Sequence, residues 1–329
     1  MRKLNRILIP TDLSEGSRKA YQYSESLLRV FGGTVDMIHV VPTFKYLHES
    51  MKKVGYPFSL DHDVYPQIIE QTEEKVREEL DRYIPEQHRG DALVRIGRKA
   101  YEVILETSQK GAYDLILMGA QGLHADNITR GHVTEKVIRY STKPVLSVSG
   151  SVLANETEQI LVPTDFSDFS LKAVLPAAIT AGRLNAGITL FHVKELHGSE
   201  PNGPTDLADE AADEAFRGRV VKRLETFFAQ RPRAGVQILE KQGEWLFVLH
   251  RDEEKYEIPL QIARVRGISA HYEIVDYAEE HAQMIVIATH GRTGLLHMFL
   301  GSTSEKVVER ARIPVLTIRP KEAVARMKK

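Results

Sequence analysis

The chain has 329 residues, 44 basic and 45 acidic side chains for a formal net charge of −1, no cysteine, and 42% hydrophobic residues. This length exceeds that of one typical domain of about 100–150 residues, so two hydrophobic cores are expected. The near-neutral charge argues against a protein that holds nucleic acid through a broad basic face. The absence of cysteine excludes disulfides, thiolate catalysis and cysteine-ligated zinc.

The amino-terminal segment shows no targeting signal. Only one run of four apolar residues, at 7–10, precedes Thr11 and Asp12. That run is too short for the core of a signal peptide or for a membrane span. We therefore expect a cytoplasmic protein without membrane contact and without a nucleic-acid partner.

Apolar strand-like runs alternate with amphipathic patterns along the first half of the chain. They predict strands at 6–9, 34–40, 93–96, 114–118 and 144–148, and helices at 18–31, 65–83, 101–109 and 134–141. Strands that are apolar on both faces and separated by helices are typical of a parallel, doubly wound sheet.

The second half of the chain repeats the first. NRILIPTDLS at 5–14 matches EQILVPTDFS at 158–167, and the segment 134–148 matches 304–318. Asp12 and Asp165 are 153 positions apart, whereas Gly131 and Gly301 are 170 positions apart, so the second copy holds about 17 additional residues. We expect two tandem Rossmann-like α/β domains, each a five-stranded parallel sheet flanked by helices.

The repeat also places the domain boundaries. The first domain spans 1–149, a polar linker 150–157, the second domain 158–320 and a basic tail 321–329. The additional residues read as a β-hairpin at about 236–266, which contains the only tryptophan, Trp245. Two interpretations of the hairpin stay open. It either extends the sheet edge and covers apolar surface, or it forms a lid or partner surface with exposed apolar strands.

Two segments of the second copy carry candidate chemistry. Asp165 lies in the turn PTDFSDFS at 163–170, where an aspartate either caps a helix or faces a ligand. After a predicted strand at 284–287, glycines and an arginine precede three hydroxyl residues that open a helix: Gly291, Arg292, Gly294, Gly301, Ser302, Thr303 and Ser304. Bared backbone N–H groups and a helix dipole favour a phosphate there. Ser302 with Glu305 is also a capping box, which needs no ligand.

Taken together, these segments resemble the universal stress protein family. The resemblance rests on PTDFS at 163–167, on a strand ending in His-Val at 192–193, and on ATHG at 288–291 followed by Gly301-Ser302. It covers both halves of the chain and implies the adenine nucleotide alpha hydrolase-like form of the fold. Nucleotide-binding members carry Gly-x2-Gly-x9-Gly-Ser/Thr, whereas this chain has Ala288 as the first residue of that motif. We expect its methyl group to weaken binding.

The resemblance implies that the second domain binds ATP, or AMP or ADP, with Mg²⁺ or Mn²⁺ as candidate ions on the phosphates. Asp165 and Val193 would contact the adenine end, and Pro163 and Thr164 would line that pocket. The ribose and phosphates would lie against Ile287, Ala288, His290, Gly291, Arg292, Gly301, Ser302, Thr303 and Ser304.

The first copy departs further from the motif. It reads GAQGLHADNITRGH at 119–132, so its spacer is one residue short, and His132 stands where serine is expected. Asp126 places a negative charge where phosphates would lie, although Asp12 and Val40 keep the adenine-end pattern. We expect this copy to bind a nucleotide weakly or not at all.

The leading hypothesis is an adenine-nucleotide-binding stress protein that acts as a sensor or adaptor. At most slow ATP hydrolysis is expected, with no catalytic residue and no metal site built from side chains. One alternative is a nucleotide-free protein-interaction module. The other is a phosphotransferase or nucleotidyltransferase, for which His290 and His297 are the acid–base candidates.

The resemblance also bears on assembly. The last strand of the family's domain usually pairs two domains, so 144–148 and 314–318 are expected to pair within the chain as an internal pseudo-dimer. The sequence leaves open whether two chains form a homodimer and which protein partner the chain binds.

Overall fold

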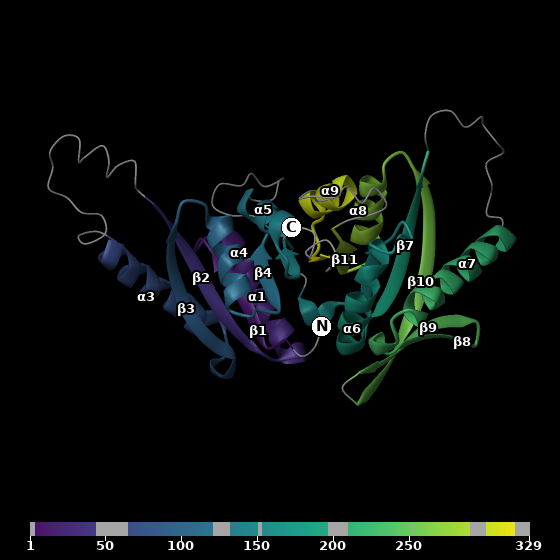
Figure 1. The fold of residues 1–329 in the computed structure, drawn as a ribbon, viewed down its shortest axis with the longest axis horizontal. Coiled ribbons are helices and arrows are strands. Elements are labelled where there is room, and N and C mark those ends of the chain that lie inside the picture. Colours follow the sequence, from purple (N-terminus) through teal and green to yellow (C-terminus); the bar gives the residue numbers. More distant parts are fainter. Residues whose placement is uncertain are drawn as a thin grey trace. The chain divides into compact units, whose positions relative to one another are not determined.

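A computed structural model describes residues 4–43, 65–120, 132–150, 153–196, 210–251, 253–289 and 301–319. The chain forms two compact units, Arg2–Ser151 and Val152–Lys329. Each unit is an α/β domain built on a parallel sheet (Figure 1). No helix in the described part of the chain is long and apolar enough to cross a membrane.

The first unit alternates strands and helices in the expected order. Its elements are β1 Arg6–Thr11, α1 Glu15–Phe31, β2 Thr34–Pro42, α3 Tyr65–Tyr83, β3 Arg89–Gly97, α4 Ala100–Lys110, β4 Leu115–Gly119, α5 His132–Tyr140 and β5 Val145–Val148. The strand order is β3-β2-β1-β4-β5, and every neighbouring pair is parallel. The five residues of β4 are all buried, as in a strand covered on both faces.

The helices of this unit cover both faces of the sheet. Right-handed crossovers from β1 to β2 and from β2 to β3 place α1 and α3 together, and the reversed connections place α4 and α5 on the other face. The ring of Tyr21 on α1 lies 5.4 Å from that of Tyr83 on α3, whereas Tyr101 on α4 stacks on Tyr140 of α5 at 5.8 Å. The doubly wound prediction is therefore confirmed.

The second unit repeats this plan with additions. Its elements are β6 Gln159–Pro163, η4 Ser170–Ala173, α6 Val174–Leu184, β7 Gly187–Glu195, α7 Glu210–Ala229, β8 Val236–Lys241, β9 Glu244–Arg251, β10 Glu254–Gly267, α8 Ala270–His281, β11 Met284–Ala288, α9 Ser302–Arg310 and β12 Val315–Ile318. The strand order is β12-β11-β6-β7-β10-β9-β8. Pairs from β12 to β10 are parallel, and β9 pairs antiparallel with both β10 and β8.

Strand β10 pairs with two different strands along its length. Its first half, Glu254–Leu260, pairs with β9, and its second half, Leu260–Gly267, pairs with β7. The second half occupies the place that β3 holds beside β2. The hairpin predicted at 236–266 is present, but its last strand continues as the fifth parallel strand of the domain. The added structure is therefore β8, β9 and the first half of β10.

The hairpin packs its apolar side chains into its own domain. Phe247 on β9 is fully buried and meets Phe228 of α7 edge to face at 6.2 Å. Tyr256 on β10 lies against α6, where a Cβ on Gly182 would come within 2.8 Å of its ring. These contacts favour the edge-extension interpretation, although Leu239 on β8 is 47% exposed.

The second copy departs from the first at the start of its opening helix. Residues Ser170–Ala173 form a 3-10 turn, η4, before α6 begins at Val174, whereas α1 is α-helical from Glu15. Pro176 stands where the first copy has Tyr23. Proline has no N–H to donate to the carbonyl four residues earlier, so regular α-helical bonding cannot run through this first turn.

Candidate functional site

The predicted site residues lie at the carboxyl ends of two neighbouring strands, β6 and β11, which pair through Met284–Ile160 and Ile285–Leu161. From β6 the chain proceeds to β7 and β10 on one side and then returns to β11 on the other side. Open α/β sheets bind ligands in the crevice at such a reversal. The ends of β6 and β11 therefore form the candidate site of the second unit.

The turn after β6 is held by its own side chains. Buried Thr164 accepts the N–H of Phe166 through Oγ1 at 2.9 Å, and its Oγ1 lies 3.0 Å from Oγ of Ser170. Asp165 Oδ1 accepts the N–H of Ser167 at 3.0 Å. Phe166 has φ 59°, a left-handed conformation that costs a non-glycine residue about 1–3 kcal/mol and persists only where neighbours enforce it. The turn is thus preorganised.

The end of β7 is joined to this turn. His192 Nδ1 lies 2.9 Å from the carbonyl oxygen of Thr164. Because a carbonyl oxygen can only accept, Nδ1 carries the proton in this contact. The first unit repeats the arrangement, with His39 Nδ1 2.9 Å from the carbonyl oxygen of Thr11. Burial lowers the pKa of His39, which keeps that ring neutral. Each histidine therefore joins the ends of two neighbouring strands through a hydrogen bond. Val193, which follows His192, is half-buried.

The start of α9 provides the second part of the site. Gly301 is the N-cap residue, and its N–H donates to the carbonyl of Thr289 at 2.8 Å. Exposed Ser302 is the first residue of the helix, so the capping box in which Ser302 was the cap is wrong. Glycine has no side-chain acceptor for the first-turn N–H groups, and such groups favour an anion.

The three hydroxyl residues differ in their roles. Ser304 is buried and donates from Oγ to the carbonyl of Ala288 at 2.8 Å, which fixes α9 to β11. Thr134 makes the same bond to Gly119 in the first unit, at 3.0 Å. Ser304 therefore anchors the helix, whereas exposed Ser302 and half-buried Thr303 remain the hydroxyl candidates for a ligand.

The remaining predicted residues are either part of the strand walls or outside the described residues. Pro163 ends β6, and Ile287 and Ala288 end β11, all three buried. Three residues of the expected phosphate loop lie outside the described residues: His290, Gly291 and Arg292. No group of three or more His, Cys, Asp or Glu that could hold a metal ion occurs within the described ranges.

Comparison with known proteins identifies the family. The universal stress protein family pattern matches residues 3–149 and again residues 156–319. This chain belongs to the universal stress protein family. It contains two tandem copies of the family's domain, which confirms the fold and the repeat expected from the sequence.

Several universal stress proteins resemble it along much of their length. A universal stress protein of Mycolicibacterium smegmatis is 24% identical over 319 residues, covering 96% of this chain and 97% of that protein. YxiE of Bacillus subtilis is 30% identical over 165 residues, covering 49% of this chain and 98% of that protein. The crystal structure of a universal stress protein from Archaeoglobus fulgidus has a TM-score of 0.57 at 21% identity, covering 96% and 99% of the two chains, and shares the fold.

The turn after the first strand has the same conformation in both universal stress protein domains: Leu13 has φ 63° and donates its N–H to Thr11 Oγ1 at 2.8 Å, as Phe166 does to Thr164. The additional contacts that hold the two turns differ. In the first domain, Asp12 Oδ1 accepts both the N–H of Ser14, at 3.1 Å, and its hydroxyl, at 2.5 Å. The Tyr21 hydroxyl of α1 also bonds to Thr11. In the second domain Val174 stands where Tyr21 stands, so this hydroxyl has no equivalent.

Position 288 of the second domain also differs from its counterpart, Gly119. Gly119 pairs with Val148, and Ala288 pairs with Ile318, so the two share one register position. A Cβ on Gly119 would come within 2.1 Å of the Gly16 carbonyl oxygen on α1. Ala288 therefore presents its methyl group to the helix side of the sheet, where η4 replaces that α-helical turn. Weakened binding through Ala288 stays a prediction.

Sequence reasoning missed an arginine that reaches the turn from another element. Arg223 on α7 donates from Nε to the carbonyl of Phe166 at 3.2 Å and from a terminal nitrogen to Asp168 Oδ1 at 2.5 Å. The hydrogen bond from Arg223 lowers the pKa of Asp168. The acidic start and later basic residues at 207–228 suit a helix, but no local signal pairs Arg223 with a turn 57 positions away.

Proposed function

We propose that the second universal stress protein domain binds an adenine nucleotide, ATP foremost, and that the first domain binds it weakly or not at all. The adenine end would lie beside the Asp165 turn and Val193. The phosphates would lie at the first turn of α9, where Gly301 lets them approach the backbone and Ser302 and Thr303 supply hydroxyl groups.

One observation carries this proposal above all others. The β6 turn is preorganised and the start of α9 has a glycine cap, and both lie at the chain reversal between β6 and β11. The turn of the first domain has the same form, with Leu13 at φ 63° and its N–H on Thr11 Oγ1 at 2.8 Å. The contrast with the first domain therefore rests on its sequence at 119–132, where the spacer is one residue short and His132 stands in place of Ser302.

A divalent ion would arrive with the nucleotide. No acidic cluster stands ready for it among the described residues, and Mg²⁺ is commonly held through phosphate oxygens and water with few protein ligands. Mg²⁺ or Mn²⁺ would therefore be held mainly by the nucleotide itself, and the side chains would orient the nucleotide.

A sensor or adaptor role is part of the proposal. His192 Nδ1 is engaged by the Thr164 carbonyl, and Asp165 Oδ1 by the N–H of Ser167, so both groups are committed to the turn. The acid–base candidates of the transferase alternative, His290 and His297, lie outside the described residues. Occupancy by the nucleotide, with slow hydrolysis at most, would then be the signal.

Isothermal titration calorimetry with Mg²⁺-ATP tests the proposal. Wild-type protein should bind about one nucleotide per chain, and Gly301→Val should abolish the heat while thermal unfolding stays cooperative. The φ of −57° at Gly301 suits valine, so the substitution acts through its side chain rather than through backbone strain. Wild-type protein that shows no heat at millimolar ATP would overturn the proposal.

A further inference from the structure

Arg223 connects α7 to the turn that begins the candidate site. Its Nε donates to the Phe166 carbonyl at 3.2 Å, and a terminal nitrogen donates to Asp168 Oδ1 at 2.5 Å. Arg231, two residues beyond the end of α7, lies 3.8 Å from the other oxygen of Asp168. One rigid guanidinium thus holds two acceptors of the same turn, a geometry that lysine cannot reproduce.

The acceptor matters because Phe166 is the strained residue of the turn. Its N–H is held by Thr164 Oγ1, and its carbonyl is held by Arg223, so both flanking peptide groups are fixed. A left-handed non-glycine residue persists only where its surroundings enforce it. Asp165, at the proposed adenine end, immediately precedes this residue and depends on the same conformation.

Aromatic packing links the same elements. The ring of Phe166 lies 4.9 Å from the ring of His192 on β7 and 5.9 Å from that of Phe216 on α7. The guanidinium of Arg264 on β10 lies 5.0 Å from the Phe216 ring. The turn, β7, β10 and α7 therefore form one packed cluster beside Val193.

The first domain has the same left-handed conformation at Leu13, with φ 63°, and supports its turn from α1 rather than from the following helix. Tyr21 on α1 bonds to Thr11, and the turn is closed by α1 itself. Arg18 on α1 instead pairs with Glu79 on α3 through two bonds of 3.1 Å, which join the two helices. The second domain has lost the tyrosine and gained the arginine contact from α7.

We propose that Arg223 is a positioning residue for the adenine end of the nucleotide site. It fixes the Phe166 carbonyl, in a turn whose left-handed conformation the Thr164 hydroxyl also supports, and thereby restrains the Asp165 carboxylate and the wall formed with His192. The inference rests on the proposed function. It assigns to α7 control over the affinity for the base and ribose.

The test compares ATP with adenosine, which has the same base and ribose but no phosphates. Dissociation constants for Mg²⁺-ATP and for adenosine are measured by calorimetry or by NMR titration on the full chain. Arg223→Met should weaken both ligands by about tenfold, because the loss lies entirely at the adenine end. Arg223→Lys should recover part of that loss. Gly301→Val should weaken ATP and leave adenosine within twofold.

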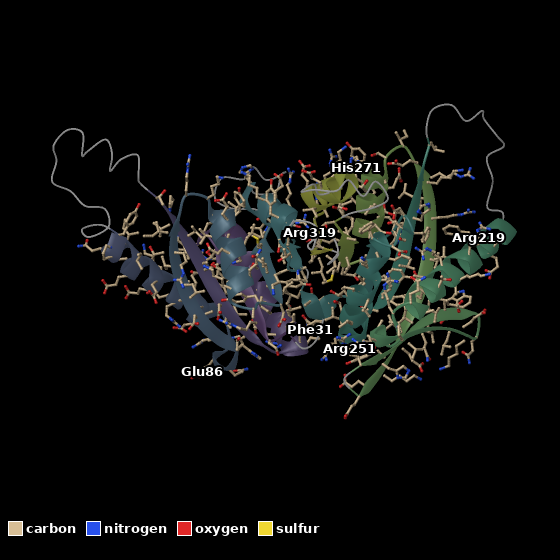
Figure 2. All side chains as sticks on the ribbon, in the orientation of Figure 1. Phe31, Glu86, Arg219, Arg251, His271 and Arg319 are labelled. Atoms are coloured by element: carbon tan, nitrogen blue, oxygen red, sulfur yellow. The ribbon has the colours of Figure 1, made fainter. Side chains whose placement is uncertain are left out.

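Two matched controls separate positioning from general destabilisation. Arg219→Met removes a charge from an exposed position of the same helix (Figure 2). Arg18→Met removes the helix–helix ion pair of the first domain. Both should leave the two dissociation constants within twofold. Should Arg223→Met fail to fold, Asp168→Asn frees one half of the same contact and should weaken both ligands by about threefold.

The outcomes distinguish the two claims. If wild-type protein binds ATP and Arg223→Met, or Asp168→Asn in its place, binds ATP and adenosine like wild type, the role assigned to Arg223 is wrong and the proposed function stands. If Arg223→Met weakens ATP alone, the arginine does not act at the adenine end. If wild-type protein binds neither ligand, the proposed function itself fails.

Discussion

Asp36→Ala removes an acceptor on which three donors of the first domain converge. The Asp36 side chain is 2% exposed and accepts from the Arg6 guanidinium, from the Tyr113 hydroxyl at 2.5 Å and from the N–H of Asp91 at 2.8 Å. The Arg6 guanidinium also lies 4.7 Å from the centre of the Tyr113 ring. Substitution would leave the buried Tyr113 hydroxyl without this acceptor, whereas Arg6, which is 40% exposed, keeps its bond to the Gly111 carbonyl and Asp91 is exposed.

Because the Arg6 guanidinium can be hydrated, the loss is that of a buried acceptor of charged-group hydrogen bonds, about 2–3 kcal/mol. With a urea m-value of about 2 kcal/mol per M, the midpoint should fall by roughly 1–1.5 M. The second domain supplies a matched control, because Thr189 stands where Asp36 stands and accepts one bond, from Gln159 Nε2 at 2.7 Å. Thr189→Ala should cost only about 1 kcal/mol.

Urea denaturation followed by circular dichroism measures both losses. The fluorescence of Trp245, which lies in the second unit, follows that unit separately. A loss for Asp36→Ala no larger than that for Thr189→Ala would refute the reasoning, because three converging donors would then contribute no more than one neutral bond.

Three further predictions follow from the described structure. Burial, followed by the bond to Asp36, raises the pKa of Tyr113 above its ordinary 10.0, so the folded chain keeps this proton to higher pH than the unfolded chain and loses stability above about pH 10. Urea denaturation against pH should show a less steep loss for Tyr113→Phe than for wild-type protein, and equal slopes would contradict this. Asp12→Ala should leave calorimetric ATP stoichiometry at about one per chain, whereas a fall from two to one would assign a site to the first domain. Phe247→Ala should cost about 3–5 kcal/mol in urea denaturation and exposed Leu239→Ala about 0.5 kcal/mol or less, and similar costs would contradict the packing assigned to the hairpin.

Much of the fold follows from periodicity and repetition in the sequence. The helix predicted at 65–83 matches α3, Tyr65–Tyr83, because its apolar positions recur at helical spacing against the sheet. The repeat predicts the tandem domains, which the family match confirms. Local patterns also predict the hairpin, since the polar turn at 251–254 separates two apolar runs.

Features that depend on backbone geometry or on distant partners were not predicted. Serine before glutamate suggests a capping box at Ser302, yet the helix begins one residue earlier than that reading requires, with Gly301 as its cap. The 3-10 turn η4 follows from Pro176, which the repeat alone conceals. In the sequence, Arg223 is one of many charged residues of its helix. Only the tertiary structure shows that it reaches the Phe166 carbonyl.

Native mass spectrometry of the freshly purified full chain with Mg²⁺-ATP counts the nucleotides bound to each chain. Wild-type protein should carry one adenine nucleotide per chain, and Gly301→Val should carry none. Wild-type chains that carry no nucleotide, or Gly301→Val chains that carry as much as wild type, would contradict nucleotide binding by the second domain.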